Sequence, residues 1–176
     1  MVIALSGKKR SGKDTFHEFV VEHEREVPVF KFSFADAVKR YAEEYFYIDL
    51  KNDEKERIRF VLQGIGQMMR EEVDKDYWVK RVAESIEQTR KEHENFIGII
   101  TDVRYKNEAE WALKNCTALI RVVNPSSPTN DTHQSEIDLD DFSFSNFLYN
   151  NSSLENYRKA VIEWIETQKK LLLTNP

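Results

Sequence analysis

A glycine- and lysine-rich segment near the start of the chain carries the strongest chemical signal in the sequence. Residues 6–15 read Ser-Gly-Lys-Lys-Arg-Ser-Gly-Lys-Asp-Thr and contain the G-x-x-x-x-G-K spacing of a phosphate-binding loop. The apolar run Val2–Leu5 precedes them, and apolar residues at helical spacing follow. Because a glycine turn and a helix N-terminus direct backbone N–H groups at one anion, this context favours a phosphate site over a glycine turn with surface lysines.

Lys13 is the residue of this loop expected to reach the β- and γ-phosphates of a nucleoside triphosphate and to counter their charge during transfer. The other residues expected to bind the triphosphate here are Gly7, Lys8, Lys9, Arg10, Ser11, Gly12, Asp14 and Thr15. Asp14 replaces the Ser or Thr whose hydroxyl usually binds Mg²⁺. A carboxylate is a hard oxygen ligand, so Asp14 is a candidate for the ion, and the Thr15 hydroxyl is the alternative.

Asp102 and Arg104 are further candidates, just after the apolar run Phe96–Thr101. Ligands of open parallel sheets bind at the carboxyl ends of strands, so Asp102 is placed to hold Mg²⁺ or its water; its alternative role is a helix N-cap. Arg104 offers a planar fork to a phosphate, and its alternative is an ion pair with Glu108.

Candidates for binding the second substrate lie between these two segments. Gln63, Gln67 and Arg70 share one helical face that suits a nucleotide base and its phosphate, although a solvated polar face is an equal alternative. Trp78 could stack on a base, but aromatic residues at helical spacing are more often core. Lys31 lies inside the second apolar run and could point at the phosphates, or could be the exposed residue of an edge position. Three residues after that run could line the same rim, with a plain helix-surface position as the alternative for the last of them: Ser33, Asp36 and Lys39.

An alternating α/β framework must position these residues. Five short apolar runs alternate with helical periodicity, which predicts βαβ units and a parallel sheet. These expected strands are Val2–Leu5, Val29–Phe32, Phe96–Thr101, Ala118–Val123 and Phe147–Tyr149. Residues 43–94 hold about two helices and no strand, with Asp76 as a candidate cap. A capping box at 152–155 opens the last helix, and 124–141 is expected to be a long loop.

The chain resembles the phage-type deoxynucleoside monophosphate kinases in several segments. Residues 6–14, with aspartate after the lysine, are similar to the phosphate loop of that family, and animal phosphomevalonate kinases have a similar loop. The other similar segments are residues 32–39 (F-x-F-A-D-x-x-K), 62–78 (L-Q…R…D-x-W), 102–109 (D-V-R-x-x-N-E-A) and 133–136 (H-x-S-E). The resemblance extends from the first residue to about residue 157.

This resemblance implies a three-layer α/β P-loop fold with a five-stranded parallel sheet in one domain, residues 1–176. A helical insertion at about 36–94 would bind the monophosphate, and a short lid would lie at about 124–141. The implied reaction moves the γ-phosphoryl group of ATP, with Mg²⁺, to a deoxynucleoside monophosphate. Lys13, Arg10 and Arg104 would be catalytic. The segment 150–152, with Asn151, would hold the adenine through backbone groups, and a turn with a helix cap is its alternative role. The lid has no arginine, unlike the lids of many nucleotide kinases; the nearest is Arg121.

Composition excludes several other classes of protein. The formal charge of −5, from 26 Lys+Arg and 31 Asp+Glu, argues against a dedicated nucleic-acid coat. No apolar run approaches the roughly 18 residues that span a bilayer, so no membrane partner is expected. Cys116, the single cysteine, excludes an internal disulfide and fits a reducing cytoplasm, that of the host if the protein is viral. The four histidines lack the spacing of zinc ligands.

Two alternatives stay open at this point. The acceptor could be another phosphorylated small molecule, such as phosphomevalonate or dephospho-coenzyme A, although an aliphatic acceptor would not need the glutamine face or Trp78. The chain could also be a non-catalytic nucleotide sensor, whereas the absence of an N-K-x-D motif argues against a GTP switch. The accepted bases, the preference for deoxyribose and the oligomeric state, including a homodimer, are not specified by the sequence.

Overall fold

The computed structural model describes residues 1–48, 50, 55–128 and 133–174. The chain divides into two compact units: residues 1–31 with 95–176, and residues 32–94. The helical insertion expected at about 36–94 falls inside the second unit.

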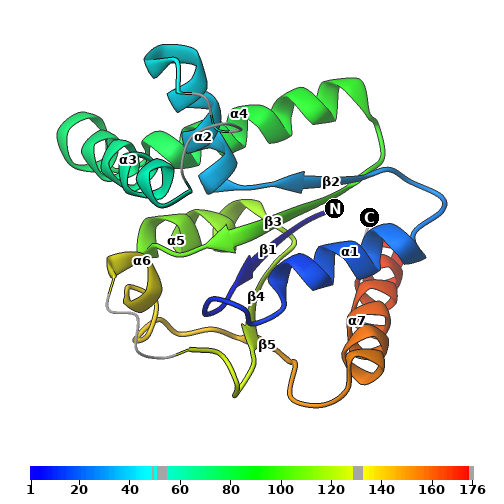
Figure 1. Ribbon diagram of the computed structural model, residues 1–176. Helices are drawn as coiled ribbons and strands as arrows, with labels where there is room; N and C mark the ends of the chain where they lie inside the picture. Colours follow the sequence, from blue (N-terminus) through cyan, green and yellow to red (C-terminus); the bar gives the residue numbers. More distant parts are fainter. Residues whose placement is uncertain (49, 51–54, 129–132, 175–176) are drawn as a thin grey trace. The chain divides into compact units, whose positions relative to one another are not determined.

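A five-stranded parallel sheet organises the first unit, as the sequence predicts (Figure 1). The strands are β1 (Val2–Ser6), β2 (Val29–Phe32), β3 (Ile97–Val103), β4 (Ala118–Val123) and β5 (Asn146–Tyr149), in the order β2-β3-β1-β4-β5. The strand β1 lies at the centre, and Ile3 pairs with both Ile99 and Ala118. The pairing of β1 with β3 shifts register between Ala4 and Ser6, immediately before the glycine-rich loop.

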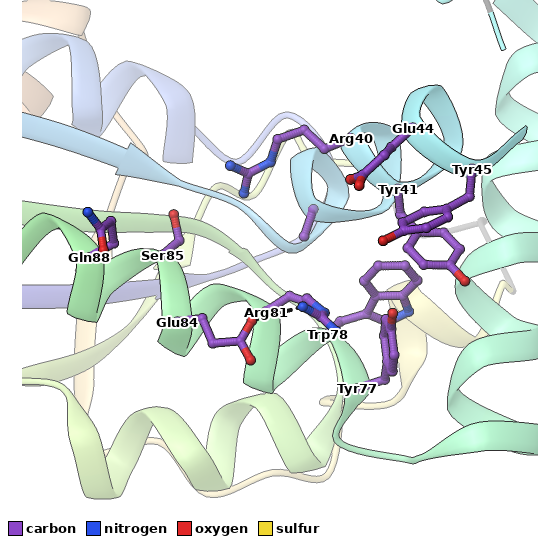
Figure 2. Close-up of a pocket in the computed structure, with 11 residues that line it drawn as sticks. Arg40, Tyr41, Glu44, Tyr45, Tyr77, Trp78, Arg81, Glu84, Ser85 and Gln88 are labelled. Atoms are coloured by element: carbon purple, nitrogen blue, oxygen red, sulfur yellow. Dashed lines mark hydrogen bonds and ion pairs between the residues drawn. The ribbon is translucent and has the colours of Figure 1, made fainter. Parts of the chain in front are cut away.

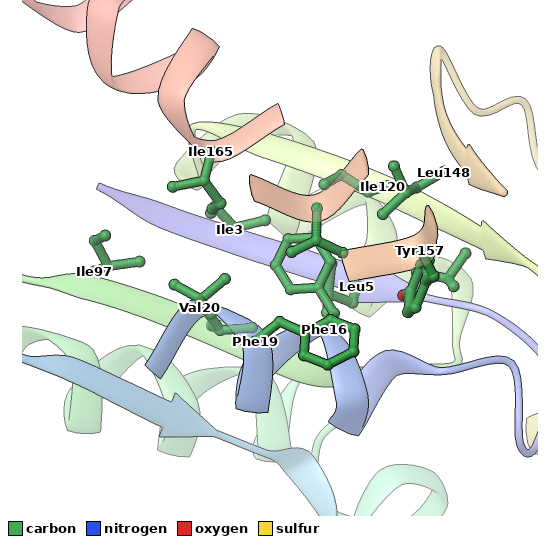
Figure 3. Close-up of a cluster of buried hydrophobic side chains, with 13 residues drawn as sticks. Ile3, Leu5, Phe16, Phe19, Val20, Ile97, Ile120, Leu148, Tyr157 and Ile165 are labelled. Carbon is green, nitrogen blue, oxygen red and sulfur yellow. The ribbon is translucent and has the colours of Figure 1, made fainter. Parts of the chain in front are cut away.

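The main hydrophobic core lies between this sheet and the helices α1 (Lys13–His23) and α7 (Leu154–Thr174) (Figure 3). Alternate residues of the central strand, Ile3 and Leu5, point into it and are fully buried against Phe16 of α1. Strand residues alternate between the two faces of a sheet, so the intervening Ala4 points to the opposite face. The helix α5 (Lys106–Asn115) contacts β4 and buries Ala109 outside the main core, which completes three layers.

Four helical segments make up the described part of the second unit: α2 (Phe34–Phe46), α3 (Lys55–Met68), the π-helical turn η1 (Met69–Val73) and α4 (Tyr77–Glu92). The buried residue Trp78 joins α4 to α3 because its indole N–H donates a hydrogen bond to the carbonyl of Gly66 at 3.0 Å. Its ring packs edge-on against Tyr41 and Tyr77. The second unit therefore has an aromatic core of its own.

Two expectations about helix ends need correction. Asp76 stands at the N-cap position of α4, but its side chain makes no capping hydrogen bond. The last helix begins one residue later than the predicted box, because Ser153 rather than Ser152 is the capping residue and its Oγ accepts the N–H of Asn156 at 3.2 Å. The expected long loop contains a short helix, α6 (Gln134–Ile137). None of the helices in the described ranges has the length and apolarity needed to cross a bilayer.

Candidate phosphate-binding site

The loop between β1 and α1 curls around the ammonium group of Lys13. This group donates hydrogen bonds to the carbonyls of Gly7 at 2.7 Å and Lys8 at 2.8 Å, and to Ser11 Oγ at 3.3 Å. Positive φ angles at Gly7 (+151°), Arg10 (+63°) and Gly12 (+108°) produce the curl. The spacing of glycines and lysine thus gives the compact loop that the sequence predicts, with Lys13 buried at its centre.

Glycine is required at both ends of the loop. A Cβ atom on Gly7 would lie 2.5 Å from the carbonyl oxygen of Val122, and one on Gly12 would lie 2.6 Å from Nδ2 of Asn150. Real Cβ atoms essentially never approach other heavy atoms so closely, and L-residues avoid such positive φ angles. The loop can therefore pack against β4 and against the segment after β5 only with glycine at these positions.

Two side chains from the C-terminal part of the chain hold the loop in place, and sequence reasoning assigned this role to neither, although Asn150 lies in the segment 150–152 expected near the adenine. Asn150 Nδ2 donates to the carbonyl of Ser11 at 3.0 Å, and the hydroxyl of Tyr157 donates to the carbonyl of Gly12 at 3.0 Å. The predicted residue at this point, Asn151, is exposed. The available signal was the position of Asn150 directly after a strand, where side chains lie at the carboxyl edge of the sheet.

Burial lowers the pKa of Lys13 from 10.5 to about 8. This pKa also includes the effect of the positive charge of Arg104, which lowers it, and of the negative charges of Glu136, Asp14 and Asp102, which raise it. Burial dominates because a charged ammonium loses its hydration there. The predicted residues Asp14, Asp102 and Arg104 therefore lie close enough to Lys13 to act on its charge.

The side chain of Arg104 contacts Glu136 rather than the predicted alternative partner. Glu108 is fully buried and accepts the backbone N–H groups of Arg104 and Tyr105 at 2.8 and 3.1 Å, so it orders the backbone instead. The alternative role of Asp102 as a helix cap is also wrong, because Tyr105 occupies the N-cap position of α5.

The acidic segment 133–141 makes several contacts with the loop and with β4. Lys8 Nζ donates to the backbone oxygen of Glu136 and to Asp140 Oδ1, each at 2.5 Å. Arg121, on β4, lies 3.6 Å from the same aspartate and donates to Ser6 Oγ at 2.9 Å. Arg121, the arginine nearest to the expected lid, thus extends from β4 to Ser6, at the start of the glycine-rich loop.

The candidate metal ligand Asp14 is exposed and pairs with a lysine in the ligand-free protein. Asp14 Oδ1 pairs with Lys31 Nζ at 2.7 Å, and the Asp14 side chain is 73% exposed. No group of three or more His, Cys, Asp or Glu side chains comes together among the described residues. Mg²⁺ commonly needs only one or two carboxylates besides substrate phosphates and water, so Asp14 and Asp102 stay candidates.

The predicted acceptor residues of the second unit mostly make local contacts. Ser33 caps α2 by accepting the N–H of Asp36 at 3.1 Å, and Lys39 pairs with Asp36 at 2.6 Å. On the other predicted face, Arg70 donates to the carbonyl of Gly66 at 3.0 Å. Next to it, Gln67 donates to Glu71 at 2.9 Å, while Gln63 is half-buried. Trp78 is 1% exposed, which corrects the idea of a stacking platform in favour of the core interpretation.

A cavity of about 400 Å³ lies between α2 and α4 of this unit, and sequence reasoning did not anticipate it (Figure 2). Tyr41, Tyr45 and Tyr77 gather around Trp78 at one end of it. The guanidinium carbon of Arg81 lies 5.1 Å above the ring centre of Tyr77. The other polar residues that line the cavity are Arg40, Glu44, Glu84, Ser85 and Gln88. The second unit therefore offers two polar surfaces, this cavity and the face with Gln67 and Arg70.

Comparisons with known proteins add independent findings. The sequence model of the family "Deoxynucleotide monophosphate kinase" matches residues 42–161. The chain is 24% identical, over 97% of its length and 99% of the other, to the "Putative deoxynucleotide monophosphate kinase" of Acanthamoeba polyphaga mimivirus. Similar solved structures include a dephospho-CoA kinase from Campylobacter jejuni (TM-score 0.59, 14% identity, 94% and 95% of the two chains). A gluconokinase from Sinorhizobium meliloti is also similar (TM-score 0.51, 14% identity, 99% and 97% covered). At this identity, the two solved structures establish the fold alone.

Proposed function

This chain belongs to the deoxynucleotide monophosphate kinase family, and we propose that it transfers the γ-phosphoryl group of ATP to the phosphate of a deoxynucleoside monophosphate. The observation that carries the proposal is the loop itself, in which a buried lysine lies among backbone groups between a central strand and a helix N-terminus. This arrangement provides positive charge for the donor phosphates.

Catalysis in this proposal consists of positioning and charge neutralisation. Lys13 contacts the β- and γ-phosphates, and the guanidinium groups of Arg10 and Arg104 counter the charge that develops during transfer. Asp14 or Thr15, with Asp102, would hold Mg²⁺, which supplies further positive charge to the phosphates when bound. The attacking oxygen belongs to an ionised phosphate, so no strong general base is needed.

The other residues of the loop, with the backbone at Asn151, complete donor binding. Asn150 and Tyr157 act through the loop, because they fix the carbonyls of Ser11 and Gly12 without needing to touch the nucleotide. Such positioning matters for rate, since small displacements of reacting groups are costly.

Residues 32–94 bind the acceptor in this proposal. Gln63, Gln67 and Arg70 would contact the base and the phosphate, and the start of the unit would contribute Ser33, Asp36 and Lys39, with Lys31 just before it. Arg70 must then exchange its bond to the Gly66 carbonyl for the ligand. The cavity between α2 and α4 is the competing position for the acceptor, because it combines aromatic rings with Arg81.

An assay of ADP release tests the proposal. The protein and MgATP are supplied with each of the four common deoxynucleoside monophosphates, with their ribonucleotide counterparts, and with dephospho-coenzyme A and phosphomevalonate. We expect turnover with at least one deoxynucleoside monophosphate, and we expect Lys13→Ala to abolish that turnover. Turnover with only dephospho-coenzyme A or only phosphomevalonate would support the alternative kinase. Slow ATP hydrolysis that does not depend on an acceptor would support a sensor.

A pair of arginine variants separates the two candidate acceptor surfaces. If the face with Gln67 binds the acceptor, Arg70→Ala should raise the KM for the monophosphate about tenfold or more, because a charged hydrogen bond is lost. Arg81→Ala should leave that KM within about twofold. The reverse pattern would assign the acceptor to the cavity and would refute the predicted residues.

A further inference from the structure

The H-x-S-E segment at 133–136 has no role in the proposed function, yet it forms a defined local structure. His133 occupies the N-cap position of α6, where its Nδ1 accepts the backbone N–H of Ser135 at 3.2 Å and lies 2.8 Å from the Ser135 hydroxyl. This cap begins the short helix and places Glu136 in its first turn. His133 and Ser135 therefore form a cap that places Glu136 at the start of the helix.

The carboxylate of Glu136 contacts the groups that are expected to bind donor phosphates. Its Oε2 accepts the backbone N–H of Lys9, in the glycine-rich loop, at 3.2 Å. Its Oε1 accepts a hydrogen bond from the guanidinium of Arg104. Its negative charge also acts on Lys13, whose pKa it raises. A loop N–H group, a guanidinium and a nearby ammonium are the partners that a phosphate oxygen would have in this loop.

Burial distinguishes this contact from an ordinary surface ion pair. The Glu136 side chain is 7% exposed, although the neighbouring residues Lys9 and Arg10 are exposed. Exposed ion pairs contribute little because water screens them, whereas a buried carboxylate needs partners at both oxygens. Both oxygens of Glu136 have such a partner, one from the loop and one from Arg104.

We propose that Glu136 is an internal substitute for a donor phosphate. In the ligand-free protein its carboxylate holds the Lys9 N–H and the Arg104 guanidinium in a phosphate-binding arrangement, and the bound nucleotide displaces it. This inference rests on the proposed donor site. Because the incoming ligand must replace a carboxylate with two partners, ligands with several phosphate charges are favoured over monophosphates at this loop.

Glu136→Gln tests this role, with Asp138→Asn as the matched control. The glutamine keeps the shape of the Glu136 side chain and removes its charge. Asp138 belongs to the same segment, but its carboxylate accepts hydrogen bonds from the backbone N–H of Lys106 at 2.7 Å and from the side chain of Gln134 at 2.6 Å, not from the loop. Calorimetry then measures the Kd of MgATP and of inorganic tripolyphosphate, which has no base. We expect Glu136→Gln to bind both about tenfold more tightly, since a charge-assisted contact no longer competes, and Asp138→Asn to stay within about twofold.

A thermal melt supplies a second reading. Glu136→Gln should lower the melting temperature of the ligand-free protein and increase the stabilisation that tripolyphosphate gives, because the ligand replaces the lost anion. Glu136→Asp, which keeps the charge but shortens its reach, should tighten binding less than Glu136→Gln does.

Other results would overturn the inference. Unchanged or weaker binding by Glu136→Gln would show that the carboxylate does not compete with phosphate. Equal tightening in Asp138→Asn would assign the effect to net charge alone. In both cases the wild-type protein still binds MgATP, and the proposed function stands. If neither the wild type nor any variant bound MgATP or tripolyphosphate, the donor site and the proposed function would fail together.

Discussion

Replacing Lys13 by methionine should change the stability of the ligand-free protein in a way that depends on pH. Burial lowers the pKa of Lys13 from 10.5 to about 8, which corresponds to a penalty of about 3 kcal/mol for the charged folded form. Methionine has a similar unbranched shape without the charge, so the variant does not carry this penalty. The variant loses the hydrogen bonds of the ammonium group at every pH, so this loss adds a constant to the stability difference. The burial penalty of the wild type changes with pH, so it alone makes the difference depend on pH.

The sign of the pH dependence follows from proton binding. Below pH 8, Lys13 is charged in both states and the wild type carries the whole penalty. Between pH 8 and 10.5 the unfolded chain binds more protons than the folded protein, so the stability of the wild type rises with pH. We expect the wild type to gain about 2 kcal/mol relative to Lys13→Met between pH 6.5 and 9.5, since part of the penalty remains at pH 9.5.

Urea denaturation, followed by circular dichroism across this pH range, measures the difference directly. Lys159→Met, at a side chain that is 76% exposed, controls for the loss of one lysine. Groups that titrate equally in both proteins cancel in the comparison. The buried-ammonium argument would be refuted if the difference in the free energy of unfolding between the two proteins stayed constant with pH. It would also be refuted if the wild type became less stable relative to Lys13→Met as the pH rises.

Three further predictions concern the loop and the second unit. Gly12→Ala should destabilise the protein by about 1–3 kcal/mol in urea melts, because its Cβ meets Asn150 at a positive φ; Gly64→Ala, with open space around it, should not. Asn150→Ala should raise the KM for ATP about fivefold through the loosened loop, and Asn151→Ala should leave it unchanged. Trp78→Phe should cost about 1–2 kcal/mol, since the buried indole hydrogen bond between α4 and α3 is lost even though Arg70 still donates to the Gly66 carbonyl; an equally stable variant would contradict this.

The sequence predicted the framework well because its apolar runs are short and clearly bounded. The strands β2 and β4 agree with the expected ranges, and the other three differ by one or two residues at their ends. Strands that are buried on both faces of a sheet need continuous apolar residues, and this pattern is visible without any long-range information. The glycine spacing likewise predicted the loop, since positive φ angles are encoded locally.

Contacts between distant segments were not predictable in the same way. Arg104 pairs with Glu136, 32 residues later, although Glu108 is nearer in sequence. Likewise, Tyr157 reaches the Gly12 carbonyl across 145 residues. Helical spacing shows which neighbours on the same helix a side chain can contact, but it does not show which side chain of a distant element will be its partner. The cavity between α2 and α4 was missed for the same reason, because its rings come from two helices.

Chain topology restricts how such a protein can diversify. Residues 32–94 connect β2 to β3, which are neighbours in a parallel sheet. The connection must therefore run from the carboxyl end of β2 back to the amino end of β3. A parallel crossover needs about a dozen residues or more even when it carries no binding site. A shortened descendant could therefore trim this segment to a single bridging helix but could not delete it. Variation in what the segment recognises can accumulate while the central strand and its glycine-rich turn are retained.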